Sequence, residues 1–119
     1  MTPDELENRL VDFAVIIIEI SSNLIRNDSG RNMSNQITRS GTSPALNYGE
    51  ARGAESIKDF IHKVKIILKE LRETRISLKI ISKANLYQKD LVFLENAKKE
   101  CDELISIFVS SSKTAQQKH

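Results

Sequence analysis

Four basic residues with heptad spacing are the residues of this chain best suited to bind a charged ligand. They are Lys58, Lys65, Arg72 and Lys79. Because an α-helix makes about two turns in seven residues, side chains at this spacing fall on one line along its surface. Such a line can follow the phosphates of a nucleic acid. The alternative is an ordinary solvated helix face, with Glu70 and Glu73 supplying countercharge.

Two further arginines in the preceding segment extend this candidate surface. No aromatic residue interleaves with the bases, so the pattern does not favour stacking on unpaired nucleic-acid bases. The candidate nucleic-acid-binding residues are therefore Arg39, Arg52, Lys58, Lys65, Arg72 and Lys79.

Groups suited to catalysis are sparse. His62 lies near Asp59, but metal sites in helical bundles use paired Glu-x-x-His motifs, and the second histidine is the terminal His119. We expect His62 to be a surface or boundary residue, and the lone Cys101 to be a small buried hydrophobe at a core position. The sequence has no phosphate-binding glycine loop and no nucleophile elbow. It therefore predicts no catalytic residue, no metal, no cofactor and no enzyme.

The segment 39–51 brings polar groups into what should be a packed helix. Buried polar groups need hydrogen-bond partners, and side chains of the following helix can supply them. We predict a structural polar network that fixes helix register, with a pocket or a subunit contact as the functional alternative. Its members are Asn47, Tyr48, Glu50, Lys63, Lys69 and Thr74.

Four amphipathic helices account for most of the chain. Thr2 and Pro3 begin the first with a capping hydroxyl and a proline at its first turn, and residues 27–30 are expected to end it, with Gly30 free to adopt positive φ. Its wide apolar stripe predicts that this helix is covered on more than one side. The second begins at about residues 32–34, and Pro44 predicts either a kink or a break between residues 39 and 44.

The second half of the chain carries the clearest periodicity. Ser56, with Asp59 three residues later, begins a helix expected over residues 56–83, and Asn85 marks the turn after it. A fourth helix is expected from about Gln88, with a polar tail that frays over about residues 110–119. Four such helices pack most economically as an all-α, antiparallel, up-down-up-down four-helix bundle, and 119 residues suffice for one domain over 1–119.

Charge is unevenly distributed although the formal net charge is only +2. Residues 1–30 hold six acids and two bases, whereas residues 56–89 hold nine bases and three acids. The single cysteine cannot form an internal disulfide, which favours the cytoplasm. The apolar run 13–18 is too short to span a bilayer, and its acidic flanks do not fit a signal peptide, so no membrane role is expected.

The stretch from Arg39 to Thr74 resembles a known bacterial family. The resemblance rests on Asn47-Tyr48-Gly49-Glu50-Ala51, Asp59-Phe60-Ile61-His62-Lys63 and Lys69-Glu70-Leu71-Arg72-Glu73-Thr74, and it extends over nearly the whole chain. The family is the four-helix bundle proteins, also called 23S rRNA intervening sequence proteins. The resemblance implies a four-helix bundle that assembles into a ring, with pentamers seen in the family. It also implies relatives that serve reverse transcriptases of retroelements as basic accessory proteins, and it implies no enzyme.

Two functional hypotheses follow from these observations. The first is a homo-oligomeric, pentameric helical bundle that binds RNA or DNA through its basic helix face, where several copies acting on one strand increase the avidity. The second is a protein–protein adaptor or assembly module that binds an unidentified protein partner and no nucleic acid.

Overall fold

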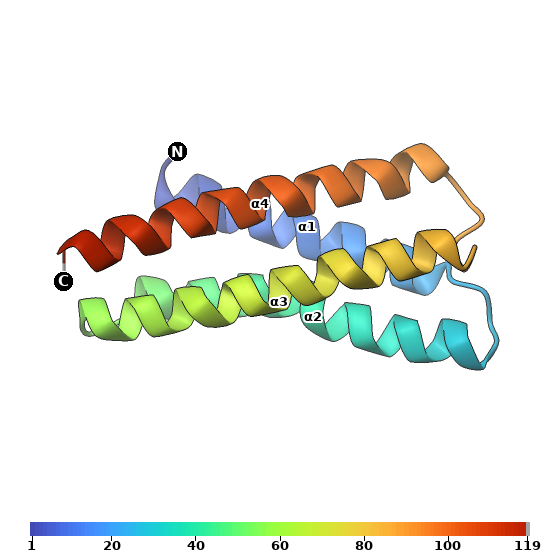
Figure 1. Ribbon diagram of the computed structural model, residues 1–119, viewed down its shortest axis with the longest axis horizontal. Helices are drawn as coiled ribbons and strands as arrows, with labels where there is room; N and C mark the ends of the chain where they lie inside the picture. The colour runs from blue at the N-terminus through green and yellow to red at the C-terminus, as the bar shows by residue number, and fades with distance from the viewer. Residues whose placement is uncertain (119) are drawn as a thin grey trace.

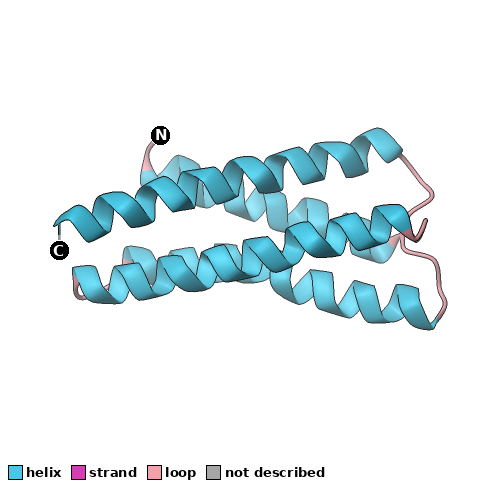
Figure 2. Ribbon diagram, in the orientation of Figure 1, coloured by secondary structure: helices cyan, strands magenta, loops and turns pink. Residues whose placement is uncertain are grey.

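The computed structural model describes residues 1–118, which form four long antiparallel helices (Figure 1). They are α1 (Pro3–Ser22), α2 (Asp28–Arg52), α3 (Ile57–Lys83) and α4 (Leu91–Lys118). Each helix packs against the next in sequence, and α4 packs back against α1, so the topology is the expected up-down-up-down bundle. Helices and loops account for the whole ribbon in Figure 2, and both chain ends lie at the same end of the bundle.

The core is a column of apolar side chains from all four helices. Phe13, Ile37, Leu71 and Phe108 represent the four helices in it, and each is fully buried. Burying apolar surface of this kind is the main driving force for folding. No helix within residues 1–118 has the length and apolar character that crossing a membrane would require.

Several helix ends form as the sequence predicts. The Thr2 hydroxyl accepts a hydrogen bond from the Glu5 N–H (3.1 Å), and the Ser56 hydroxyl accepts one from the Asp59 N–H (3.1 Å). Each satisfies an amide at a helix start that has no partner within its own helix. Asn85 has φ 53°, as a turn after α3 requires.

The boundary between α1 and α2 differs from the prediction. Residues 27–30 begin α2 instead of ending α1, because the Asn27 side chain accepts a hydrogen bond from the Gly30 N–H (2.7 Å) and so caps α2. Gly30 does not adopt positive φ. A side chain there would overlap the Ile25 carbonyl oxygen, so a close backbone approach explains this glycine.

The predicted break near Pro44 is also absent. The helix α2 runs without interruption through Pro44, and Figure 1 shows that its axis changes direction near the middle, in agreement with the predicted kink. Proline cannot donate a hydrogen bond to the preceding turn. The Thr42 hydroxyl donates to the Thr38 carbonyl (2.7 Å), a contact that often bends helices.

The last helix is longer than expected at one end and shorter at the other. It begins at Leu91 instead of about Gln88, because Asp90 Oδ1 accepts hydrogen bonds from the N–H groups of Val92 (3.0 Å) and Phe93 (3.2 Å). It continues to Lys118, so residues 110–118 do not form a frayed tail, and His119 lies outside the described residues. The reason is that Ala115, seven residues after Phe108, is still buried.

Candidate nucleic-acid interface

The heptad line of α3 is exposed along its whole length. Lys58, Lys65, Arg72 and Lys79 are all exposed, and within residues 1–118 none of their charged groups lies within 4.0 Å of a carboxylate. From first to last they span 21 residues, or about 32 Å at 1.5 Å per residue. The line therefore presents four positive charges to solvent at one surface.

Arg39 does not contribute a free charge to this surface. Its guanidinium bonds to Glu70 Oε2 (2.8 Å) and Glu73 Oε2 (2.7 Å) and so joins α2 to α3. The hydrogen bond to Glu73 and the negative charge of Glu70 raise the pKa of Arg39. Glu73 and Glu70 thus neutralise Arg39, not the heptad line.

Arg52 is likewise held by acids. It contacts Asp4 (2.8 Å) and Glu7 (3.1 Å) and joins α2 to the first turns of α1. The hydrogen bonds to Asp4 and Glu7 raise its pKa. Two of the six candidate residues therefore have an evident role inside the bundle, and the remaining four all belong to α3.

One of the predicted network contacts forms, between helices α2 and α3. Lys63 Nζ donates to Glu50 Oε2 (3.0 Å). Asn47 instead donates to the Ser43 carbonyl within its own helix (3.0 Å), and Lys69 is exposed. Tyr48 packs its ring edge-on against Phe108, with centroids 5.6 Å apart, and burial raises the pKa of its hydroxyl.

The hydrogen-bond partners of Thr74 differ from those predicted. Its buried hydroxyl bonds to the Ser40 hydroxyl (2.9 Å) and the Glu70 carbonyl (2.8 Å). A second hydroxyl contact joins α1 to α2, where Ser21 lies 2.6 Å from the Ser34 hydroxyl and 2.7 Å from that of Thr38. Sequence reasoning missed these hydroxyl contacts, because a serine or threonine in the sequence does not indicate which neighbouring helix its side chain will face.

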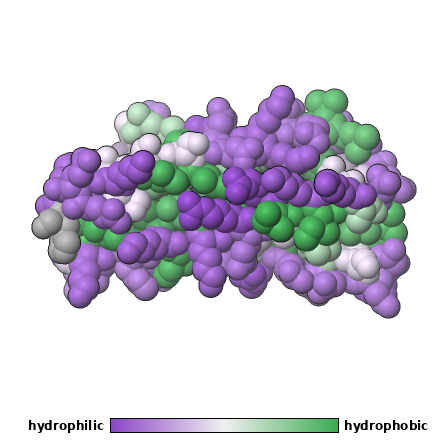
Figure 3. All heavy atoms as spheres, viewed as in Figure 1, coloured by the Kyte–Doolittle hydropathy of each residue, from purple (hydrophilic) through white to green (hydrophobic). Residues whose placement is uncertain are grey.

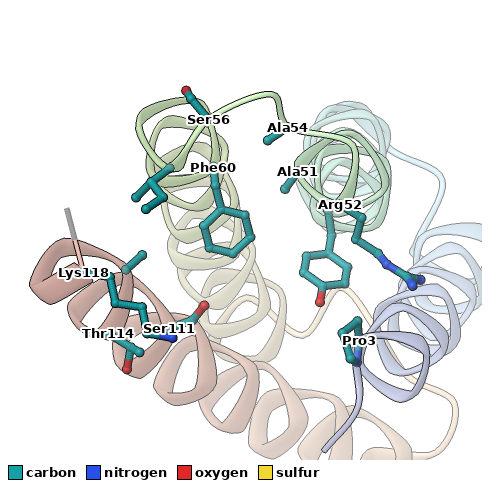
Figure 4. Close-up of a pocket in the computed structure, with 12 residues that line it drawn as sticks. Pro3, Ala51, Arg52, Ala54, Ser56, Phe60, Ser111, Thr114 and Lys118 are labelled. Carbon is teal, nitrogen blue, oxygen red and sulfur yellow. The ribbon is translucent and has the colours of Figure 1, made fainter.

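Two hollows lie near charged residues. A groove of about 600 Å³ runs between α2 and α3 beside the heptad line, and Lys69, Arg72 and Ile76 lie along it. A larger pocket of about 750 Å³ opens at the end of the bundle that holds the chain termini (Figure 4). Phe60 and Ala51 give it an apolar wall, and Arg52 and Lys118 lie at its sides.

Cys101 and His62 have the environments predicted for them. Cys101 is fully buried, its thiol faces the Leu71 carbonyl (3.3 Å), and burial raises its pKa to about 12. A thiol in this state is protonated at neutral pH and is no nucleophile. His62 is exposed. Within residues 1–118 no three His, Cys, Asp or Glu side chains are grouped to hold a metal ion.

Sequence reasoning misjudged the outer face of α1. The wide apolar stripe predicted a helix covered on more than one side, yet Val15 (57%) and Ile18 (45%) are exposed, as is Val11 (47%). Figure 3 shows the opposite side of the bundle, where α3 and α4 present mostly hydrophilic side chains and apolar groups gather along their seam.

Comparison with known proteins agrees with this architecture. The fold defines a four-helix bundle protein with one strongly basic helix. Residues 5–110 match the family model of the 23S rRNA-intervening sequence protein, and the chain belongs to this family. A crystal structure of a protein with unknown function from the S23 ribosomal protein family of Bacteroides thetaiotaomicron is similar, with a TM-score of 0.83 and 31% sequence identity. The match covers 95% of this chain and 99% of that one. No curated protein matches the chain significantly.

Proposed function

We propose that this chain is a cytoplasmic, non-enzymatic bundle protein that forms homo-oligomers and binds the phosphate backbone of RNA or DNA through α3. The observation that carries the proposal is the line of four exposed bases without carboxylate partners. Surface charges without partners are available to phosphates, whereas Arg39 and Arg52 would first have to leave their acids. The resemblance described above leads us to expect five copies in the oligomer.

The chemistry of the α3 face favours phosphates over bases as its ligand. Single-strand binders stack nucleic-acid bases on exposed aromatic rings. Each of the six aromatic residues of this chain is buried or half-buried. Lysine and arginine contacts to phosphates are independent of nucleotide sequence. We therefore expect binding without sequence preference.

The test is fluorescence anisotropy with labelled RNA and DNA of matched sequence, as single strands and as duplexes. The variant replaces Lys58, Lys65, Arg72 and Lys79 by Gln. Neutralising four phosphates gives a slope of about −3.6 for log K against log salt on a duplex, so wild-type affinity falls about a hundredfold between about 50 and 200 mM salt. The variant should bind more weakly at low salt and lose most of this slope.

A matched control removes the same charge elsewhere. It replaces four bases outside the α3 face that make no ion pair within residues 1–118, namely Lys89, Lys99, Lys113 and Lys118. This variant should keep the wild-type slope. Equal loss in both variants would mean that only overall charge matters, and wild-type protein that binds no nucleic acid at low salt would refute the proposal.

A second candidate function is a protein–protein adaptor without nucleic-acid binding. The exposed apolar side chains Val11, Val15 and Ile18 on α1 favour it, because exposed apolar stripes commonly mark protein contacts. An adaptor would retain its partner after the four-base replacement on α3 and lose it after replacement of the α1 stripe. The nucleic-acid proposal predicts that the replacement on α3 is the damaging one.

A further inference from the structure

The pocket at the end of the bundle that holds the chain termini has no part in the proposed function. Side chains of all four helices and of the loop before α3 line it, and none of the four bases of the heptad line is among them. Its volume of about 750 Å³ is within the range of small-molecule sites. Such sites are mostly apolar and hold a few polar groups that orient the ligand.

The sequence of α4 explains why the pocket is there. Leu104 and Phe108 fill the core with large apolar side chains, but the next positions of the same stripe hold the small residues Ser111 and Ala115. Figure 4 shows Phe60 of α3 on the other side of the hollow from Ser111. Phe60 is only half-buried, and Ile57 beside it is exposed. An apolar wall of α3 therefore faces space that residues 1–118 do not fill.

A tyrosine hydroxyl at the pocket lacks a partner. Tyr48 lines the pocket and is only 6% exposed, yet its hydroxyl makes no hydrogen bond within residues 1–118. The hydroxyl is not among the side-chain atoms that are sealed from solvent without a partner. Buried hydroxyl groups are normally hydrogen-bonded. The pocket is thus the place from which a ligand can supply the missing partner.

The charges at the pocket favour an anionic ligand. Its lining includes two bases, Arg52 and Lys118, and no acid. Arg52 is largely neutralised by Asp4 and Glu7. Lys118 is exposed and makes no ion pair within residues 1–118. An unpaired ammonium beside an apolar wall is suited to a carboxylate attached to an apolar body.

We propose that this pocket binds a small aromatic carboxylate, with its ring against Phe60 and its carboxylate held by Lys118 and the Tyr48 hydroxyl. Aromatic rings pack favourably edge-on or offset against one another. The flexible stem of lysine allows its ammonium to follow the carboxylate into the pocket. The site is independent of nucleic-acid binding, because the bases of the heptad line do not contribute to it.

The test compares two compounds that share a ring system and differ in charge. The probe is 1-naphthoate, and the neutral control is 1-naphthalenemethanol. Binding is measured by saturation-transfer difference NMR, which observes the ligand and so works for a monomer or an oligomer. The expected Kd of 1-naphthoate is about 0.1 to 1 mM for a ligand of this size. The alcohol should bind about threefold to fivefold more weakly, because it cannot pair with Lys118.

A filling variant locates the site. Ser111→Leu places a large apolar side chain in the hollow and should weaken 1-naphthoate binding at least about tenfold. Leucine favours helix more than serine does, so this variant should remain folded. The matched control is Ser110→Leu, at an exposed neighbouring position that does not line the pocket. It should bind 1-naphthoate as the wild type does.

Two further variants test the polar groups. Lys118→Gln should weaken 1-naphthoate binding about threefold to fivefold and leave the alcohol unaffected, whereas Lys113→Gln, away from the pocket, should change neither. Tyr48→Phe keeps the ring and removes the hydroxyl, so it should weaken 1-naphthoate binding about fivefold. Its urea unfolding should match the wild type, because the hydroxyl has no hydrogen bond within the bundle to lose.

Three results would overturn the proposal. The first is no saturation transfer to 1-naphthoate at concentrations up to about 10 mM, well above the expected Kd. The second is equal affinity for the two compounds, which would exclude recognition of the carboxylate. The third is unchanged binding in Ser111→Leu, which would place the compound elsewhere. Nucleic-acid binding is measured on separate samples, so its absence would refute the proposed function and leave the pocket result standing.

Discussion

Two glycines of α2 provide a paired test of how closely the bundle is packed. Gly41 is buried, and a Cβ added there would lie 2.6 Å from Ile17 Cγ2 and 2.9 Å from Ile17 Cβ. Ile17 is fully buried, and its Cβ cannot move without its backbone. A Cβ at Gly49 would meet no atom within 4 Å. The same substitution, Gly→Ala, is therefore expected to change stability in opposite directions at the two sites.

The magnitudes follow from two opposing effects. Alanine gains about 1 kcal/mol over glycine in a helix interior. At Gly49 this gain is unopposed, so Gly49→Ala should stabilise the protein by about 0.5 to 1 kcal/mol. At Gly41 overpacking costs about 2 to 3 kcal/mol, which leaves a net loss of about 1 to 2 kcal/mol.

The assay is urea unfolding followed by circular dichroism, with thermal unfolding as a second measure. A change of 1 kcal/mol should shift Tm by about 4 °C in a domain of this size. The variants should differ in free energy of unfolding by about 1.5 to 3 kcal/mol, with wild type between them. Equal effects of the two substitutions would refute the claim that α1 and α2 are in contact through Gly41.

Three further predictions concern contacts between the other helices. Replacing Arg9 by Gln removes a guanidinium bonded to Glu100 at 2.7 Å through two of its nitrogens, and should cost about 1 kcal/mol in urea unfolding, with a smaller loss at high salt. Thr74→Val leaves the buried Ser40 hydroxyl without its partner and should cost about 1 to 2 kcal/mol, whereas valine at the exposed Thr114 should change stability little. The Cys101 thiol should resist a disulfide reagent in the native protein and react fully in urea. Because its pKa is raised from 9.0 to about 12 by burial, the unfolded state loses the thiol proton first, and stability should fall by about 1.4 kcal/mol per pH unit between these values. A Cys101→Ala variant, compared by urea unfolding over the same pH range, should lack this part of the slope.

The sequence predicts the helices well where apolar periodicity and capping residues agree. The helix α3 has both, since Ser56 caps its start and Lys83 is its last residue as expected. The start of α1 is similar, with Thr2 as cap and Pro3 in the first turn. At both helix starts the capping residue fits only one structural role, the beginning of a helix.

The errors in helix boundaries occur where the same residue types fit two different structural roles. Asparagine and glycine are common both after a helix and before the next one, so residues 27–30 fit either role. The structure assigns them to the start of α2, because Asn27 bonds to the Gly30 N–H, while Asn23 ends α1 by bonding back to the Glu19 carbonyl (2.8 Å). Such contacts depend on backbone geometry, which short-range sequence patterns do not specify.

The candidate site could be predicted from the sequence only in part. The line of bases on α3 needs only helical spacing, so it could be found from sequence. The neutralisation of Arg39 by Glu70 and Glu73, and of Arg52 by Asp4 and Glu7, depends on which helices are neighbours. Charge counting along the chain assigns Glu70 and Glu73 to the basic segment, although both form their ion pairs with Arg39 of α2.

Net charge is a poor guide to the surface of this protein, because its charges are separated by face. A value of +2 suggests little affinity for polyanions, yet the exposed face of α3 carries six bases and one acid. The compensating acids lie on α1, at the diagonally opposite corner of the bundle. The apolar stripe of α1 extends beyond the side that packs into the core, so Val11, Val15 and Ile18 remain exposed beside these acids.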